Sequence, residues 1–341
     1  MEYRFRGVNE ALQCLCREIL DKGVWRETRG HKCLEFPEPV NIIITNPSNR
    51  ICNIKERKWN YILPYVESLW LALGYNNLDD LPGYYVKSIY NYSDDDKHWR
   101  AGYGSRLRNF NGSTKDYMIG KSFDRCDKII HQVDQFKFIE DSFNRDKNTR
   151  QAGITIHDVM KDNFDKGCNL KITRDQPCTR TLQLQMSVDG KLNFTTTMRS
   201  NDLCFGFSHV NIFNFTFMQE YWSSILDIPM GQYYHFANNL HIYEDKVDMI
   251  RCIAEAEDYE DSEFSTEYNK NFKSLYEFDV LCKILEKSEE DYRLGNFYIP
   301  DEFDDFFSDW AKIFIYKNCK LLNKKFEYIF VDEKLNIYLE V

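Results

Sequence analysis

Apolar residues recur at helical spacing in the first half of the chain. The pattern predicts helices over residues 8–20, 60–76 and 131–146, a buried strand over the apolar run 40–47, and a loop over the polar, glycine-containing segment 94–108. Glu67 lies inside the apolar stretch of the second helix. Because carboxylates are rarely buried without a partner, this position points to a buried group with a specific role.

Strict alternation predicts a β-hairpin directly after Cys178. Apolar and polar residues alternate over 182–188, Asp189 and Gly190 supply a tight turn, and the alternation returns over 192–198. Cys178 therefore stands just before the first strand of the hairpin.

The remaining third of the chain changes in composition. The sequence predicts a largely buried helix over 211–226, a strand over 231–245, an acidic linker over 254–271, helices near 271–287 and 302–316, and a final strand over 326–331. We expect a main domain over residues 1–250 and an acidic, aromatic-rich C-terminal extension over residues 251–341.

Composition narrows the class of protein. A chain of 341 residues with 43% hydrophobic content can bury one large core with an appendage, and no apolar stretch approaches the roughly 20 residues that span a bilayer. The net charge of −10 argues against a nucleic-acid partner, since such partners require a basic surface. The eleven cysteines contain no CxxC pair, and no secretory signal follows Met1. We expect a soluble, cytoplasmic protein without a metal site.

Cys178 is one cysteine among eleven, and taken alone it would be read as a small core residue. Its neighbours change this interpretation. Pro177 precedes it, and three polar groups follow in order: the cluster Arg199-Ser200-Asn201-Asp202, then Asn211, then the pair His241 and Tyr243.

This ordered set resembles the thymidylate synthase family, including phage deoxycytidylate hydroxymethylases. The resemblance lies in RDQPCTRTLQLQMSVDGKLNFTTTMRSNDLCFGF, in NIF, and in GQYYHFANNLHIYE. Shorter matches are TRG at 28–30, Glu67, WRAGYG at 99–104 and NTRQA at 148–152, so the similarity covers roughly residues 20–250. It implies an α+β fold in which a large mixed β-sheet packs with helices and pairs, sheet to sheet, in a homodimer. The extension could cap the active site or add to the dimer surface.

The resemblance implies a reaction at carbon 5 of a pyrimidine nucleoside monophosphate. The thiolate of Cys178 would add to carbon 6, and the activated ring would attack the one-carbon group of 5,10-methylenetetrahydrofolate. A thiol needs nearby positive charge to ionise, and Arg199 would supply it. Glu67 and Tyr103 would organise water for proton transfer, and Asp202, together with Glu67, would contact the folate.

The resemblance also implies how the nucleotide is bound. Arg29, Arg199 and Ser200 would hold the phosphate, with Arg150 donated by the other subunit. Gln151 replaces a second family arginine, so phosphate affinity could be weaker or shared with Arg174. Asn211 would read the base, while His241 and Tyr243 would hold the sugar hydroxyl. The competing interpretations are ordinary surface arginines and a satisfied core histidine.

Departures from the synthase pattern favour a hydroxymethyl product. Thr179 replaces the histidine that usually follows the nucleophile, and Tyr90 stands in place of a tryptophan beside the folate. The base is ambiguous, because Asn211 favours uracil whereas the wording of the motifs favours cytosine. His209 lies in a one-residue insertion before Asn211, where it could reach the base or be exposed.

The leading hypothesis is therefore a CMP or dCMP 5-hydroxymethylase. A thymidylate synthase or hydroxymethylase acting on dUMP is the alternative within the fold, and a non-catalytic nucleotide-binding protein is the alternative of another class. The sequence leaves open ribose against deoxyribose, and the pathway.

Overall fold

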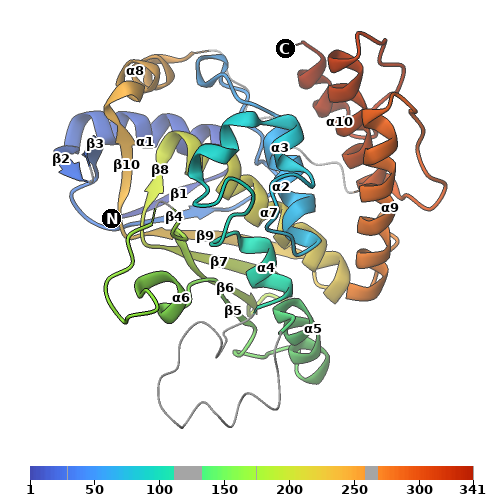
Figure 1. The fold of residues 1–341 in the computed structure, drawn as a ribbon, viewed down its shortest axis with the longest axis horizontal. Coiled ribbons are helices and arrows are strands. Elements are labelled where there is room, and N and C mark those ends of the chain that lie inside the picture. The colour runs from blue at the N-terminus through green and yellow to red at the C-terminus, as the bar shows by residue number, and fades with distance from the viewer. Residues whose placement is uncertain (29, 111–132, 174, 258–267, 341) are drawn as a thin grey trace.

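The protein combines two β-sheets with packed helices (Figure 1), so the predicted α+β class is confirmed. The computed structural model describes residues 1–28, 30–110, 133–173, 175–257 and 268–340. Among these residues, no helix has both the length and the apolar composition needed to cross a bilayer.

The larger sheet is mixed and has six strands. In spatial order they are β1 (Glu2–Phe5), β4 (Val40–Ile44), β9 (Met230–Ala237), β7 (Leu192–Met198), β6 (Thr179–Met186) and β5 (Gly153–Thr155). The predicted strand over 40–47 is confirmed as β4. The predicted hairpin is also confirmed, since β6 pairs antiparallel with β7 and Leu184 lies opposite Phe194.

The smaller sheet has four strands and continues two strands of the larger one. Its order is β2 (Val24–Thr28), β3 (His31–Glu35), β10 (Leu240–Tyr243) and β8 (Asn201–Asp202). The single strand predicted over 231–245 is wrong, because the chain breaks at Asn238 and Asn239 and changes sheet. β7 breaks at the same level, before β8. Two backbone hydrogen bonds tie these breaks together, Asn238 N to Met198 O at 2.9 Å and Asn201 N to Asn239 O at 2.8 Å.

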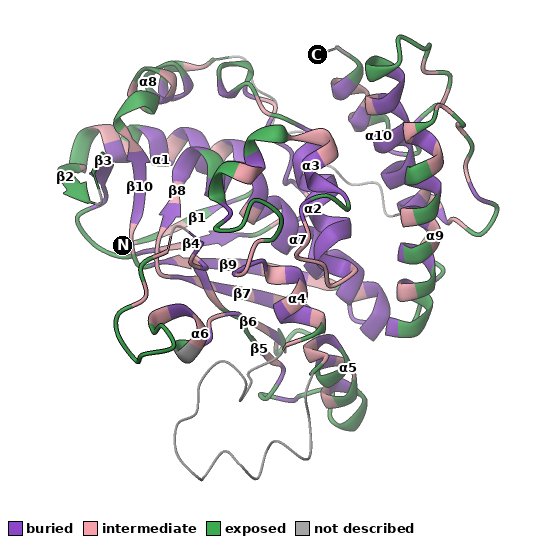
Figure 2. Cartoon of the chain, in the orientation of Figure 1, coloured by how far each residue is buried: buried purple, intermediate pink, exposed green. Residues whose placement is uncertain are grey.

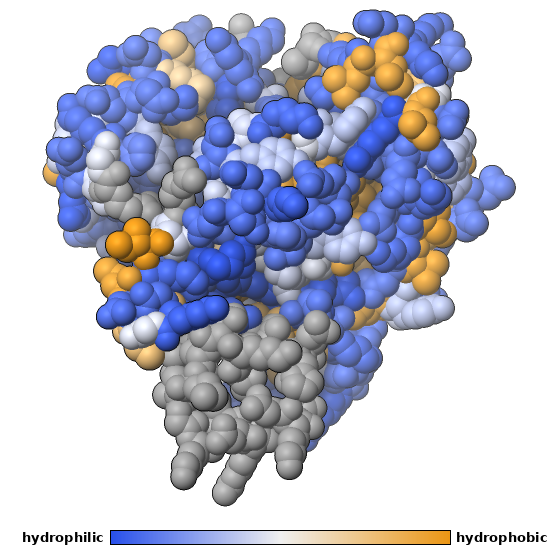
Figure 3. Space-filling model, in the orientation of Figure 1, coloured by the Kyte–Doolittle hydropathy of each residue, from blue (hydrophilic) through white to orange (hydrophobic). Residues whose placement is uncertain are grey.

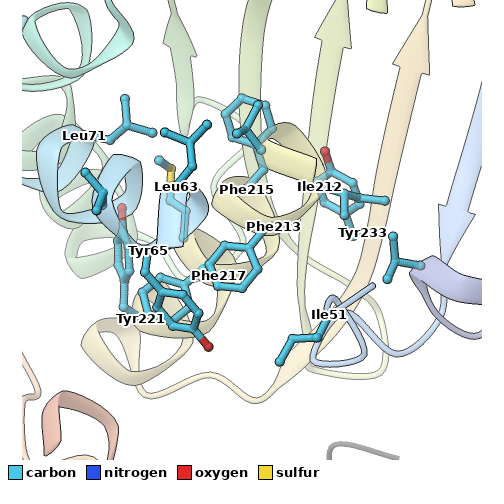
Figure 4. Close-up of a cluster of buried hydrophobic side chains, with 14 of the residues drawn as sticks. Ile51, Leu63, Tyr65, Leu71, Ile212, Phe213, Phe215, Phe217, Tyr221 and Tyr233 are labelled. Carbon is cyan, nitrogen blue, oxygen red and sulfur yellow. The ribbon is translucent and has the colours of Figure 1, made fainter. Parts of the chain in front are cut away.

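Three helices form the layers on one side of the larger sheet, and the sequence predicted all three or their cores correctly. They are α2 (Ile62–Ala72), α5 (Gln135–Arg145) and, next to the strands, α7 (Ile212–Leu226). A further helix, α1 (Val8–Lys22), packs on β1. α7 contacts β7 and β9 on one side and α2 on the other, which explains why nearly every residue in it is buried (Figure 2). Figure 4 shows the aromatic cluster between α2 and α7, in which the rings of Tyr65 and Phe213 are 4.7 Å apart.

Shorter helices connect these elements. They are α3 (Pro82–Tyr85), α4 (Tyr103–Arg108), α6 (Val159–Asn163) and α8 (Val247–Glu255). The prediction of a loop over 94–108 is wrong at its C-terminal end, where residues Tyr103–Arg108 form α4. Tertiary contacts hold this helix despite its polar sequence, because the guanidinium of Arg106 donates to Ile156 O and to both carboxylate oxygens of Asp162.

The C-terminal extension forms a helical pair beside α2, and both predicted helices are confirmed. α9 (Leu275–Arg293) is capped by Ser274 and α10 (Asp305–Leu321) by Asp304. Figure 3 shows a mostly hydrophilic surface with hydrophobic side chains gathered mainly along these helices. The strand predicted over 326–331 is wrong, because this segment pairs with no strand and instead packs Phe326 against Tyr316. Part of the predicted linker, residues 258–267, lies outside the described residues.

The end of the chain returns to the start of α2. The ring of Tyr338, which is 2% exposed, lies 5.0 Å from that of Tyr61 and 6.0 Å from that of Trp59. The tail is thereby packed on the loop that precedes α2, although some 270 residues of sequence separate the two in a chain of 341.

We expect Tyr338→Ala to lower the free energy of unfolding by about 3 kcal/mol, because the substitution leaves a cavity among buried rings. Chemical denaturation measures the loss. Tyr276→Ala is the matched control, since Tyr276 on α9 is 77% exposed and its loss should cost little. Equal effects of the two substitutions would contradict this packing.

Candidate active site

Cys178 lies half-buried at the point where the chain enters β6. The backbone N–H of Arg199 donates to Cys178 O at 2.9 Å, which ties the loop before β6 to the end of β7. The side chain of Arg199 holds the same loop. Its Nε donates to Pro177 O at 3.1 Å, and its Nη2 lies 3.2 Å from Gln176 O and 3.6 Å from Cys178 Sγ. The structure thus brings the predicted thiol and cation into contact.

The WRAGYG segment clamps this loop from the other side. The backbone N–H groups of Arg100 and Ala101 donate to the two carboxylate oxygens of Asp175, at 2.5 and 3.1 Å. Tyr103 Oη accepts from Thr179 N at 3.1 Å, and burial, reinforced by the charge of Cys178, raises the pKa of Tyr103 to about 12. The phenol therefore contacts the residue that follows Cys178, and it remains protonated at neutral pH.

The paired breaks, between β7 and β8 and between β9 and β10, place three further predicted residues together. Ser200 Oγ lies 3.4 Å from both Asn239 Oδ1 and His241 Nδ1, and His241 Nδ1 lies 2.8 Å from Asn239 Oδ1. Because an amide oxygen only accepts, the hydrogen of the His241 ring is on Nδ1. The Tyr243 ring stands edge-on to that of His241, with centroids 5.2 Å apart.

Asp202 starts a π-helix over Leu203–Asn211 that leads into α7. Its Oδ1 accepts from Cys204 N at 2.8 Å, and burial raises its pKa to about 6. A π-helix holds more residues per turn than an α-helix, so it accommodates the extra residue that the sequence indicated before Asn211.

Of the two possibilities considered for His209 in this π-helix, exposure to solvent is wrong. The residue is buried, and its Nε2 donates to Asn60 O at 2.7 Å. Burial lowers its pKa to about 3. Its ring lies 5.8 Å from that of Trp59, so His209 connects the π-helix to the loop on which the C-terminal tail packs.

Glu67 is buried on α2 as predicted, and Asn214 of α7 is its partner. Asn214 Nδ2 donates to Glu67 Oε2 at 2.8 Å, while Ser68 Oγ donates to Asn214 Oδ1 at 3.1 Å. Burial raises the pKa of Glu67 to about 7, and the bond from Asn214 opposes this shift. A carboxyl group with this pKa can both give and take a proton at neutral pH.

Asn211 lies at the junction of the π-helix and α7. Among the described residues its carboxamide has no hydrogen-bond partner, and its Oδ1 would lie 2.9 Å from a Cβ built on Gly206. The same Cβ would also meet Asn201 Oδ1, and Asn201 Nδ2 donates to His235 Nε2 at 2.8 Å. His235 Nδ1 lies 2.9 Å from the hydroxyl of Tyr233, so a buried polar chain fixes the amide beside Asn211.

Several predicted residues are not gathered here. Arg150 is exposed in the turn before β5, and Tyr90 donates to Asp79 Oδ1 at 2.5 Å. Arg29 and Arg174 lie outside the described residues.

Sequence reasoning did not identify Asn214, Asp175 or His235. Asn214 could have been noticed as a polar residue three positions after Asn211 in an apolar helix, on the same face. Asp175 and His235 carry no such signal, since their partners come from distant segments.

We expect Glu67→Gln to remove one pH-dependent loss of stability. The folded-state pKa of Glu67 lies above its ordinary value, so its stabilising contribution is complete below about pH 4.5 and is lost as pH rises through about 7. Between pH 4.5 and 8, the free energy of unfolding of the wild type should fall relative to that of the variant by on the order of 3 kcal/mol. Parallel denaturation curves for the two proteins would show that Glu67 titrates normally.

Comparisons with known proteins agree with this geometry. The family model described as thymidylate synthase matches residues 10–293. Deoxyuridylate hydroxymethyltransferase of Bacillus phage SP01 is 30% identical over 67% of this chain, and that of Pseudomonas phage M6 is 28% identical over 73%. The chain spans 55% and 64% of the length of these two relatives.

Cellular synthases are also similar. Thymidylate synthase of Actinobacillus succinogenes is 27% identical over 70% of this chain and 80% of its own. The fold resembles that of thermostable thymidylate synthase A from Bacillus subtilis, with a TM-score of 0.57 at 18% identity over 74% of this chain and 85% of the other. Because the thymidylate synthase family model matches residues 10–293, more than half of its length, the chain belongs to the thymidylate synthase family.

Proposed function

We propose that this protein is a folate-dependent one-carbon transferase that forms a covalent bond from Cys178 to carbon 6 of a pyrimidine nucleoside monophosphate. The contact of Arg199 with Cys178 Sγ, at 3.6 Å, carries the proposal. Nearby positive charge generally favours the thiolate form of a cysteine, and Cys178 is half-buried, so part of the residue stays accessible to a substrate. An intact nucleophile with its cation also argues against the non-catalytic alternative.

Two groups move protons in this proposal. The hydroxyl of Tyr103 accepts from Thr179 N and can donate its own proton to ordered water. Glu67, with a pKa of about 7, exchanges a proton with the ring through water while Asn214 holds its carboxylate form. Both are catalytic residues in this assignment.

The described residues fit a folate. 5,10-Methylenetetrahydrofolate, when bound, supplies a one-carbon unit at the oxidation level of formaldehyde. Asp202 is half-buried and uses part of its acceptor capacity on Cys204 N, so the carboxyl can also accept N–H groups of a pteridine. Glu67 completes the assigned folate contacts.

The nucleotide would lie across the paired breaks between β7 and β8 and between β9 and β10. Asn211 reads the base with an amide that no described side chain occupies, and His241 and Tyr243 hold the sugar. Ser200 and Arg199 face the phosphate, with Arg29 and, from the partner subunit, Arg150 as further ligands. The exposure of Arg150 suits a role across an interface.

A homodimer through the larger sheet would bring Arg150 to that site. Alternate residues of β7 and β9 are only partly buried, and Thr181 and Gln185 of β6 are exposed on the face of the sheet away from α7. The ten cysteines among the described residues are all free thiols, which fits a reducing compartment such as the cytoplasm. The division at residue 250 remains a prediction.

We favour a hydroxymethyl product on deoxyuridylate. Thr179 Oγ1 is fully buried beside Cys178 and has no hydrogen-bond partner among the described residues, so it can hold the water that such a product requires. The relatives from phages SP01 and M6 carry the name deoxyuridylate hydroxymethyltransferase, and an amide at Asn211 can pair with uracil. Hydroxymethylation of CMP or dCMP remains the alternative, because the unpaired amide can turn to present the opposite edge.

The test is to incubate the protein with methylenetetrahydrofolate and each of CMP, dCMP, UMP and dUMP, following release of tritium from carbon 5 and the mass of the product. We expect release from dUMP and a hydroxymethyl product without dihydrofolate. Cys178→Ala should abolish turnover while nucleotide binding persists. Product from a cytidylate alone would select the alternative base, and no release from any nucleotide would refute the transferase assignment.

We expect Thr179→Val to lower formation of the hydroxymethyl product about tenfold, because the variant keeps the shape of the side chain and loses the hydroxyl. Thr179→Ser, which keeps the hydroxyl, is the matched control. Product analysis at saturating nucleotide measures both. An unchanged rate in Thr179→Val would exclude this hydroxyl from positioning the water.

A further inference from the structure

Arg180 occupies an irregular position two residues after the nucleophile. The pairing of β6 with β7 changes register between Thr179 and Thr181, so Arg180 is the extra residue of a β-bulge. Its carbonyl accepts from Ile156 N at 2.9 Å and from His157 N at 3.3 Å, which fixes the backbone of the bulge. A bulge re-aims a side chain that the regular alternation of a strand would send to one of the two faces.

The guanidinium of Arg180 is left without a protein partner. Its Nη1 is buried and makes no hydrogen bond, and the described residues form no ion pair with it. The side chain of Arg180 as a whole is half-buried, whereas Arg106 on α4 is buried and paired with Asp162. Leaving a buried charged donor unpaired costs free energy, so the arrangement indicates a ligand that supplies the missing acceptor.

The surroundings select an anion. Burial and then the charge of Arg199 lower the pKa of Arg180, while the charges of Asp162, Cys178 and Tyr103 oppose this shift. Two guanidinium groups that repel each other at one site are stabilised when an anion lies between them. Arg199 has already committed Nε and Nη2 to the nucleophile loop, so it can give an anion little more than one nitrogen.

We propose that Arg180 is a phosphate ligand of this site, sharing the nucleotide phosphate with Arg199. This inference rests on the proposed function, which places a nucleoside monophosphate against Cys178. It also accounts for Gln151, because an arginine contributed from the bulge of the same chain supplies the positive charge that a glutamine at 151 does not. Planar guanidinium groups bind two phosphate oxygens at once, which suits a phosphate held by a pair of arginines.

The experiment is calorimetric titration of dUMP, dCMP, deoxyuridine and deoxycytidine into the wild type and three variants. Arg180→Gln should weaken binding of the preferred nucleotide about 10- to 100-fold and leave binding of its nucleoside unchanged. Arg180→Lys, which keeps the charge but not the planar fork, should lose less. Arg251→Gln is the control, since Arg251 is 62% exposed on α8 and should show no change.

Two results would overturn the assignment. Less than a threefold change in nucleotide affinity for Arg180→Gln, or an equal loss for nucleotide and nucleoside, would show that Arg180 does not bind phosphate (~1.4 kcal/mol corresponds to tenfold). If the wild type bound neither nucleotide, the proposed function would fail together with this inference. If Arg180→Gln did not fold, as judged by thermal unfolding, Arg180→Lys would carry the same comparison.

Discussion

The architecture of the site depends on one constraint, the simultaneous break of two parallel neighbours, β7 and β9. Both strands leave the larger sheet at the same level and continue as β8 and β10 in the smaller one. Backbone hydrogen bonds between the two breaks keep them at the same level. The hydrogen bond from Arg199 N to Cys178 O attaches the loop that carries Cys178 to the break after β7. Polar residues can gather there because the break frees backbone and side chains from the regular alternation of a strand.

Behind this break, the protein buries polar groups that a purely structural core would avoid. Glu67, Asn214 and His235 are buried within or beside the aromatic cluster of α2 and α7, each with a specific hydrogen-bond partner. Such groups lower stability unless they are paired, and they fix a particular arrangement when they are. The C-terminal helices enclose the far side of α2, where Trp310 Nε1 donates to Tyr65 O at 3.2 Å. The helix that carries Glu67 is therefore buried on both sides.

Local pattern predicted most of the helices and strands. The helices with a sustained helical pattern of apolar residues, and the hairpin after Cys178, were predicted correctly because their buried faces follow from their own sequence. The break at Asn238 and Asn239 was missed because no proline or glycine interrupts the strand-like run there. α4 was missed because distant carboxylates hold it, and the strand over 326–331 was predicted from propensity although no strand edge receives it.

The residues of the candidate site likewise divide into those that the sequence indicated and those that only the fold reveals. Motifs indicated Cys178, Arg199, Ser200, Asp202 and His241. The structure brings these residues to the breaks after β7 and β9 and to the adjoining loop before β6. Partners contributed by distant segments, such as Asn214 for Glu67 and Asp175 for the WRAGYG segment, depend on tertiary contacts and could not be assigned from sequence order. The burial of His209 also depends on a distant segment, because its Nε2 donates to Asn60 O.

The most direct test of the central claim is the mass of the protein after incubation with 5-fluorodeoxyuridylate and methylenetetrahydrofolate. Carbon 5 of this analogue carries fluorine in place of the proton that turnover removes, so elimination of the sulfur is blocked and its bond to carbon 6 should persist. We predict a stable increase in mass that maps to the peptide containing Cys178 and is absent from Cys178→Ala. An unchanged mass in the wild type, or a modification on another cysteine, would contradict the assignment of Cys178 as the nucleophile.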